Sequence, residues 1–227
     1  QPSTCTYDTQ RPTVTITPQA PNNNFYSAIQ VSTPFIGTAT DDGSNPTGVS
    51  TVTLTLQDLT VSTEPFTNVG AGGTLPNWTY TPSITFFNDR QYQLTVSALD
   101  NAGNTGSSNL SFVYDVQKPT SAVTSQAAGY VTSTLSSISG TASDHIGSPS
   151  HPAGISGSSV AVAVQQVGGS WWNGSAFAAP NPIYSSATFT GVSSGTWSYN
   201  VPTALQNALI SGSTYYLISR STDNAAN

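Results

Sequence analysis

The sequence predicts an all-β protein built from two tandem β-sandwich domains, residues 1–114 and 115–227. Three observations lead to this fold class. Apolar and polar residues alternate with a period of two in runs such as "TVTLTLQ" and "YQLTVSA", which is typical of strands with one buried face. No stretch of useful length has the 3.6-residue period of a helix, and one set of landmarks occurs twice along the chain.

The composition is that of a folded chain with an uncharged, hydroxyl-rich surface. Of the 227 residues, 36% are hydrophobic and 6% are charged, against a usual charged share of about 25%. The 4 Trp, 10 Tyr and 8 Phe residues lie within the alternating runs, and they supply the core that disordered chains lack. Cys5 is the only cysteine, so no internal disulfide can form.

Five landmarks recur in the same order, which indicates two homologous domains. Four are motif pairs, and the fifth is a tyrosine, Tyr92 or Tyr215, placed eight residues before an aspartate. The motif pairs are "YDTQRPT" and "YDVQKPT", "IGTATDD" and "SGTASDH", "GVSTVTLTLQ" and "GISGSSVAVAV", and "NWTYTP" and "TWSYNVP".

Short strands separated by turn signals make each domain an immunoglobulin-like sandwich of about 105 residues. In the first domain the expected strands are 13–17, 29–40, 50–59, 77–82, 92–100 and 109–115. Residues 201–212 are the only helical candidate. With no cysteine pair available, Trp78 and Trp197 are expected to pack in cores without a disulfide.

The second domain is expected to lack its last strand. No counterpart of "SSNLSFVYD" follows the second corner, "DNAAN". We therefore expect a C-terminally truncated second sandwich from a longer array of repeats. Its open edge would be completed by a loop, by further residues, or by a strand of a neighbouring molecule.

These motifs resemble the bacterial immunoglobulin-like (Big-type) tandem repeats of large secreted and cell-surface proteins. The shared elements are a "D-x-x-x-P-T" entry, a "G-T-x-x-D" strand end, a "W-x-Y" strand and a "D-x-A-G-N" corner, and they cover residues 7–227. The second corner departs from this pattern, with Ala226 in place of Gly. The resemblance implies an extracellular or surface location and a role in adhesion, display or spacing. It implies neighbouring repeats of the same polypeptide as partners.

Most of the carboxylates are predicted to gather at one end of each domain. In this strand order the domain entry, the loop after the second strand and the last hairpin all reach the same end. Clustered like charges are costly unless a cation lies among them, and Ca²⁺ prefers carboxylate, amide and carbonyl oxygens. The predicted Ca²⁺ ligands, which would stiffen the domain junctions, are Asp8, Asp41, Asp42, Asp100, Asn101, Asp115, Asp144, Asp223 and Asn224. The alternative is that each Asp or Asn caps a turn through its own backbone.

Other function classes receive less support from the sequence. A net charge of −6 with only four dispersed basic residues excludes a basic face for nucleic acid. No apolar run is long enough to span a membrane. The catalytic motifs "G-x-S-x-G" and "H-E-x-x-H" are missing, and His145 and His151 form a weak zinc or acid–base candidate without a third ligand. The chain is therefore predicted to be non-catalytic.

A carbohydrate-binding accessory module of a larger extracellular enzyme is the alternative function. It depends on Trp171 and Trp172 in "GGSWWNGSAF", a hairpin without a counterpart in the first domain. Adjacent strand residues point to opposite faces, so one indole is expected in the core and one on the surface. An exposed indole would stack on a sugar of a surface glycan.

Overall fold

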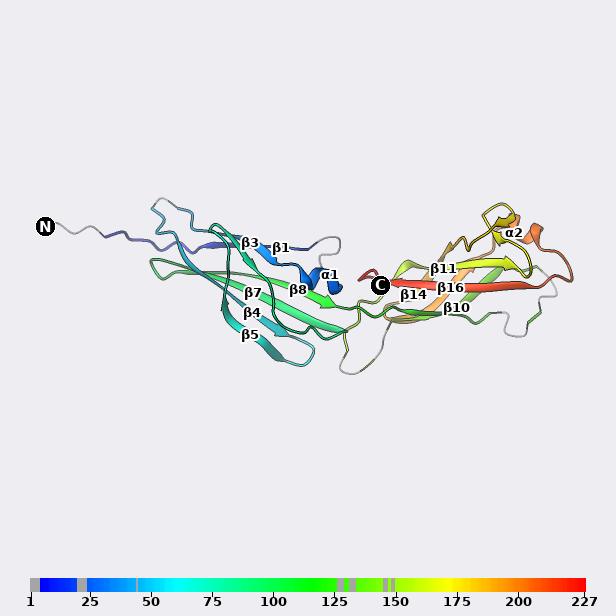
Figure 1. Ribbon diagram of the computed structural model, residues 1–227, viewed down its shortest axis with the longest axis horizontal. Helices are drawn as coiled ribbons and strands as arrows, with labels where there is room; N and C mark the ends of the chain where they lie inside the picture. The colour runs from blue at the N-terminus through cyan, green and yellow to red at the C-terminus, as the bar shows by residue number, and fades with distance from the viewer. Residues whose placement is uncertain are drawn as a thin grey trace. The chain divides into compact units, whose positions relative to one another are not determined.

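The computed structural model describes residues 5–19, 24–43, 45–125, 129–130, 134–144, 147 and 150–227. The contacts divide the chain into two compact units, shown in Figure 1. The first comprises Gln1–Val116 with Ser148–His151, and the second comprises Gln117–Gly147 with Pro152–Asn227. Strands dominate both units, as the alternating sequence predicts, so the all-β fold class is confirmed.

The first unit is a sandwich of two sheets. One has the order β1-β3-β6, with β1 at Thr13–Thr17, β3 at Phe35–Thr40 and β6 at Asn77–Tyr80. The other has the order β2-β8-β7-β4-β5. Its strands are β2 (Phe25–Tyr26), β8 (Thr105–Tyr114), β7 (Arg90–Asp100), β4 (Val49–Asp58) and β5 (Thr63–Gly70).

The alternating residues of the two sheets meet in one core. Phe35 and Trp78 of the first sheet are buried in the same cluster as Leu56, Leu94 and Phe112 of the second. Burial alternates strictly along β7, so one face of this strand lies in the core.

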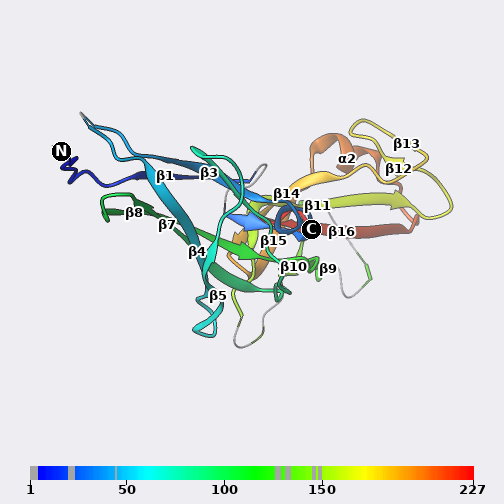
Figure 2. The same ribbon diagram turned by 60° about the vertical axis from the view of Figure 1, so that its left-hand side comes forward.

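The second unit repeats this frame with a continuous strand order, β13-β12-β11-β14-β15-β10-β9, and β16 pairs with β11. The strands are β9 (Thr120–Val123), β10 (Ser137–Ser143), β11 (Ile155–Gln166), β12 (Trp171–Trp172), β13 (Phe177–Ala179), β14 (Ser185–Gly191), β15 (Ser194–Asn200) and β16 (Tyr215–Asp223). The β12–β13 hairpin and the short helix α2 (Thr203–Ala208) lie at the same end of this unit in both views (Figures 1 and 2).

A glycine facing a tryptophan recurs in both cores. A Cβ atom on Gly37 would lie 2.6 Å from the Trp78 ring, and one on Gly140 would lie 2.6 Å from the Trp197 ring. Each indole N–H donates to a backbone carbonyl, Trp78 to Thr15 at 3.2 Å and Trp197 to Thr141 at 3.1 Å. The "G-T-x-x-D" and "W-x-Y" motifs therefore specify one packing contact, with the glycine leaving room for the indole.

A tyrosine also recurs at the start of the strand that ends at each corner. The Tyr92 hydroxyl accepts the N–H of Phe87 at 3.0 Å, and the Tyr215 hydroxyl accepts the N–H of Ile210 at 2.8 Å. In both cases the donor lies five residues upstream. A hydrogen bond of this kind is the tyrosine corner of immunoglobulin-like sandwiches, and it identifies β7 and β16 as equivalent strands.

Three local expectations need correction. The predicted strand 29–40 begins only at Phe35, because α1 (Ala28–Ser32) precedes it; Pro34 disfavours helical geometry at the residue before it, so the helix ends there. The strand β5 was not expected, since Glu64 and Pro65 are unusual in strands, but both are tolerated at the sheet edge where β5 lies. The helical candidate at 201–212 is confirmed only as α2.

Neither helix in the described part of the chain has the length and apolar character needed to cross a membrane.

We predict that Gly37→Ala destabilises the first unit by about 1–3 kcal/mol, because the new methyl group would overlap the Thr15 carbonyl and the Trp78 ring. Gly70→Ala is the matched control, since a Cβ there meets no atom within 4 Å. Urea denaturation measures both variants. Equal midpoints for the two would show that the glycine is not required by the indole.

Candidate functional site: an acidic pole in each unit

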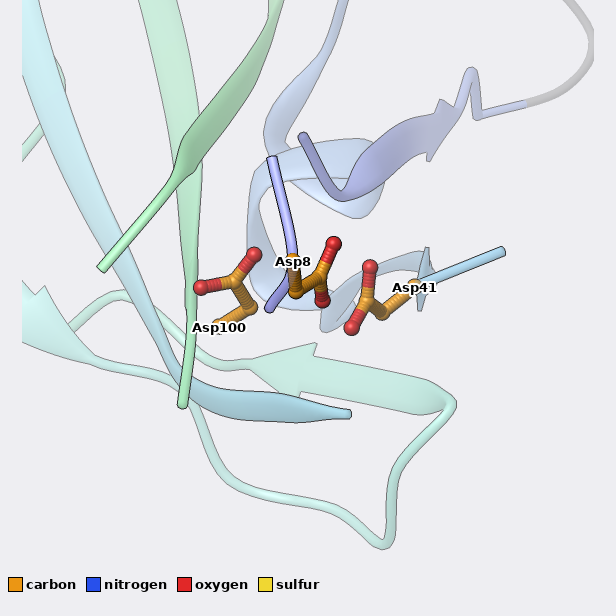
Figure 3. A group of neighbouring side chains, drawn as sticks. All are labelled: Asp8, Asp41 and Asp100. Carbon is orange, nitrogen blue, oxygen red and sulfur yellow. The ribbon is translucent and has the colours of Figure 1, made fainter. Parts of the chain in front are cut away.

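Three strand ends bring aspartates together at one pole of the first unit. Asp8 precedes β1, Asp41 follows β3, and Asp100 is the last residue of β7. One carboxylate oxygen of each lies within 4.8 Å of the other two, and Figure 3 shows the three side chains gathered there. The placement that the strand order predicts for these three residues is therefore what the structure shows.

Asp100 organises the "DNAGN" corner. Its Oδ1 accepts the N–H groups of Ala102 and Asn104, both at 2.8 Å, and its Oδ2 accepts the Asn104 amide at 2.8 Å. The residue is only 2% exposed. The carboxylate therefore exchanges water for turn donors, as an Asp at the start of a turn commonly does.

The neighbouring loop is tied to this corner through Gly48. The Gly48 N–H donates to Asp41 Oδ2 at 2.7 Å, and its carbonyl accepts the N–H of Asn101 at 3.0 Å. The Asn101 amide donates to the carbonyls of Thr47 and Gly48. Gly48 has φ +81°, a conformation that favours glycine. The backbone of the loop at Thr47 and Gly48 is thus held in place by hydrogen bonds to one carboxylate, that of Asp41, and to one side-chain amide, that of Asn101.

Asp8 joins the pole from the entry segment. Its Oδ2 accepts both the N–H of Thr47 at 3.0 Å and the Thr47 hydroxyl at 2.9 Å, and its Oδ1 accepts the N–H of Gln10. The Asn104 amide also donates to the Asp8 carbonyl at 3.2 Å. Asn104 therefore links the corner to the entry segment.

Hydrogen bonding keeps two of these acids ionised. The pKa of Asp8 is lowered first by the N–H of Gln10 and then by the hydroxyl and N–H of Thr47. Burial acts most strongly on Asp100 and raises its pKa, but the bonds from Asn104, Ala102 and Gly103 together outweigh it, so the pKa lies below its ordinary value. The carboxylates of Asp8 and Asp100 are thus held in their anionic form.

One carboxylate oxygen of the first pole lacks a hydrogen-bond donor among the described residues. Asp41 Oδ2 is bonded to Gly48, but its Oδ1 is buried and has no hydrogen-bond partner among the described residues. Leaving a buried charged oxygen unsatisfied is costly. The chemistry of this donor set, carboxylate oxygens with backbone carbonyls nearby, is that of a hard divalent cation such as Ca²⁺.

The second unit repeats several bonds of this corner. Gly154 donates to Asp144 Oδ2 at 2.7 Å, as Gly48 does to Asp41. Asn227 donates its N–H to Asp223 Oδ1 at 2.9 Å and its amide to Asp223 Oδ2 at 3.0 Å, as Asn104 does to Asp100. Four residue pairs of the sequence repeat, Gly48 and Gly154, Asp41 and Asp144, Asp100 and Asp223, and Asn104 and Asn227, therefore form equivalent bonds.

Some predicted ligands have a different position or role. Asp42 is exposed and accepts the Thr40 hydroxyl at 2.9 Å, outside the group of three, because adjacent residues of an extended chain point to opposite sides. Asn101 and Asn224 donate their amides to backbone carbonyls, Asn224 to Ala153 at 2.9 Å. These bonds position the loops, and ligation by their Oδ1 atoms stays a prediction.

Asp115 belongs to the first unit and is fully buried. Its N–H donates to the Tyr26 carbonyl at 3.0 Å. In the sequence repeat it stands where Asp8 stands in "YDTQRPT". Its role as a ligand also stays a prediction.

Sequence reasoning missed two kinds of residue. Asn104 and Asn227 complete the corners, and the shared final Asn of "DNAGN" and "DNAAN" was the available signal. The ion pair of the buried Asp58 with the partly exposed Arg90, at 2.8 Å, had no counterpart motif in the second copy to mark it. This ion pair joins the last residue of β4 to the first residue of β7, at the end of these strands away from the pole.

The two adjacent tryptophans are both buried, so the expectation of one exposed indole is not met. Trp172 is 3% exposed and packs in the main core, while Trp171 is 9% exposed and packs with Ala163 and Ala179 on the other face. The Tyr216 ring lies edge-on to Trp171 at 6.3 Å. The two indoles lie on opposite faces as expected, but the outer indole, that of Trp171, is covered by residues that include Ala179 of the hairpin. His145 lies outside the described residues.

Comparison with known proteins gives distant likenesses only. No protein-family model and no curated protein matches the chain. Similar solved structures include a tetra-tandem repeat in the extending region of a large adhesion protein (19% identity, TM-score 0.35, 96% of this chain and 47% of that one). Others are a 1.5-MDa bacterial ice-binding adhesin (15%, 0.35, 95% and 65%) and the FN1–FN3 domains of chicken CNTN1 (11%, 0.34, 94% and 62%).

This chain spans less than two thirds of the length of each of these structures. The assignment of the fold rests on the strand pairing described above.

The two corners, "DNAGN" and "DNAAN", differ at one residue, Gly103 or Ala226. Exchanging Gly and Ala at this position is therefore predicted to change the stability of the two units in opposite directions. Ala226 has φ +70° where Gly103 has φ +95°, and an L-residue in this region costs about 1 kcal/mol. We therefore expect Gly103→Ala to destabilise the first unit by about 1 kcal/mol and Ala226→Gly to stabilise the second by up to about the same amount. A Cβ on Gly103 meets no atom within 4 Å, so only the backbone is tested. Denaturation midpoints that move in the same direction would contradict this explanation.

The lowered pKa values of Asp8 and Asp100 predict a loss of stability in acid. Both groups bind protons less tightly in the folded than in the unfolded chain. Their contribution is complete above the unfolded pKa of about 3.9, and it is lost as the pH falls through the lower folded values. Urea unfolding at a series of pH values should show this fall. Asp100→Asn should be less stable at neutral pH and less sensitive to acid, and an unchanged acid slope in this variant would contradict the assignment.

Proposed function

We propose that this chain is a non-catalytic structural module of a secreted or cell-surface repeat protein, which spaces or displays a binding region, and that calcium stabilises its acidic poles. The observation that carries the proposal is the repetition of the corner in both units. Equivalent Asp, Gly and Asn atoms form the same bonds within about 0.2 Å of one another. Repeated modules of this kind build extended arrays, in which each unit adds length.

The first pole fits calcium in charge and in ligand type. Three carboxylates within 4.8 Å carry like charges, and the Asp41 Oδ1 atom has no donor to satisfy it. A divalent cation would neutralise the repulsion and satisfy this oxygen. Asp8, Asp41 and Asp100 would hold the ion, while Thr47, Gly48 and Asn104 keep the three strand ends in register.

The repeat extends the proposal to the second copy of the motifs. Asp144 and Asp223 keep the bonds of Asp41 and Asp100, and Asp115 takes the place of Asp8 in the sequence. Calcium affinities of extracellular modules are about 10⁻⁴–10⁻³ M. An affinity in this range would let the poles fill outside the cell and remain empty in the cytosol, in keeping with the proposed location.

The carbohydrate-binding alternative has no observation in its favour among the described residues, since both indoles of the hairpin are buried. The proposed role therefore rests on the repeated frame and its poles.

Calorimetry of chelator-treated protein tests the calcium proposal. Calcium at a hundredfold excess over Kd should stabilise an occupied unit by about 2.7 kcal/mol and raise its Tm. Magnesium should raise it less, because it demands a strict octahedral site. Asp41→Asn should remove most of the shift in the first unit. Asp42→Asn is the matched control, because this neighbouring carboxylate is exposed and outside the group. A Tm that does not respond to calcium, or an equal response in both variants, would refute the site.

A further inference from the structure

The turn between β12 and β13 carries the dipeptide Asn173–Gly174, and no other asparagine of the sequence is followed by glycine. Both residues are exposed. Gly174 has φ +103°, a conformation that favours glycine, and a Cβ atom there would meet no atom within 4 Å. The peptide unit that joins these two residues therefore lies at the surface, and the glycine has no side chain to cover it.

The side-chain oxygen of Asn173 accepts three hydrogen bonds within this turn. They come from the N–H of Ser175 at 2.9 Å, the hydroxyl of Ser175 at 3.0 Å and the N–H of Ala176 at 2.9 Å. Because Oδ1 reaches an N–H two residues further along the chain, the side chain curls over the Gly174 peptide unit. Donors fixed around a carbonyl oxygen stabilise the negative charge that forms on it when its carbon is attacked. The turn thus favours nucleophilic attack on Cγ of Asn173.

The two nitrogen atoms that such an attack involves are not held by hydrogen bonds. Within the described part of the chain, neither the Asn173 side-chain amide nor the Gly174 N–H donates a hydrogen bond. The corner asparagines differ, since Asn101 and Asn224 are followed by alanine and donate their amides to backbone carbonyls. At Asn173 the amide nitrogen can therefore leave, and the Gly174 nitrogen can attack, without loss of an existing hydrogen bond.

We propose that Asn173 is a site of spontaneous modification, at which the folded hairpin converts this asparagine to a mixture of isoaspartate and aspartate. The Gly174 nitrogen loses its proton to solvent hydroxide and forms a bond to Cγ. The bond from Cγ to Nδ2 then breaks, and the nitrogen takes a proton from solvent and leaves as ammonia. One water molecule opens the resulting cyclic imide at either of its two carbonyl carbons. The sum is amide plus water giving carboxylic acid plus ammonia, with no oxidant or reductant.

The isoaspartate product changes the hairpin that covers Trp171. Opening of the imide at the main-chain carbonyl routes the backbone through Cγ and lengthens it by one methylene group. In the unmodified turn the Asn173 N–H donates to the Ala176 carbonyl at 3.0 Å, and Trp171 lies opposite Ala179 in the strand pairing. A longer backbone does not fit this register. The modification therefore loosens the hairpin and adds a negative charge to it, and the Trp171 ring gains exposure.

Incubation of the whole chain in mildly alkaline buffer tests the proposal. Chymotrypsin, which cleaves after aromatic residues, releases residues 173–177, whose mass reports the exchange of amide for carboxylate, and an isoaspartyl methyltransferase labels the isoaspartate. Conversion should occur at Asn173 and become faster as the pH rises, because the attacking nitrogen must lose its proton. Gly174→Ala should slow it several-fold, because the methyl group hinders that nitrogen. Gly168→Ala is the matched control, since this turn glycine of the same hairpin has φ +77° and equally open surroundings.

A free peptide of residues 169–180 separates the effect of the fold from that of the dipeptide alone. The whole chain should convert several-fold faster than this peptide, because its three donors are already in place. Ser175→Ala, which removes the hydroxyl donor, should give an intermediate rate. Conversion of the whole chain at or below the rate of the peptide would overturn the proposal, since the three hydrogen bonds would then restrain Asn173 rather than activate it. Equal conversion at Asn101, or no isoaspartate at residue 173, would overturn it as well.

Discussion

The polar end of each unit depends on one interaction, the bonding of a buried aspartate carboxylate to the backbone of its own corner. Asp100 and Asp223 are almost fully buried at the ends of β7 and β16, yet both remain bonded to an Asn N–H and an Asn amide four residues later. Burial alone would favour the protonated acid. At Asp100 the turn donors reverse this preference. The next residue of each corner, Asn101 or Asn224, donates its amide to a carbonyl of the neighbouring loop.

The same bonding explains why the strand ends at the pole are fixed while one carboxylate oxygen there lacks a hydrogen-bond donor. Each carboxylate collects backbone donors, which fixes three strand ends with few side chains. These backbone donors do not satisfy every carboxylate oxygen, however. The buried Oδ1 of Asp41 has no hydrogen-bond partner among the described residues. Like charges in this arrangement are tolerated because the hydrogen bonds disperse them. A cation would add to an existing frame, whereas zinc-finger-like sites organise their frame from nothing.

The interior of both sandwiches follows a different rule, in which small residues make room for large ones. Gly37 and Gly140 face indoles across the sheet, and Gly106 lets the entry segment approach β8. Such glycines bring backbones and rings to distances that a methyl group would prevent. Gly37 and Gly140 connect the repeated motifs of the sequence to one packing geometry in both cores.

The sequence by itself determined the two-fold repeat, the all-β class and the convergence of Asp8, Asp41 and Asp100. These follow from period-two alternation and from strand order, which depend on local patterns and on chain connectivity. Only the tertiary structure decided that Asp42 points away while Asp41 points in, that both Trp171 and Trp172 are covered, and that Asn104 joins the corner to the entry segment. These outcomes depend on side-chain direction and on which distant segments cover a given face. Contacts between distant segments have no fixed separation in the sequence, so they cannot be predicted from one sequence alone.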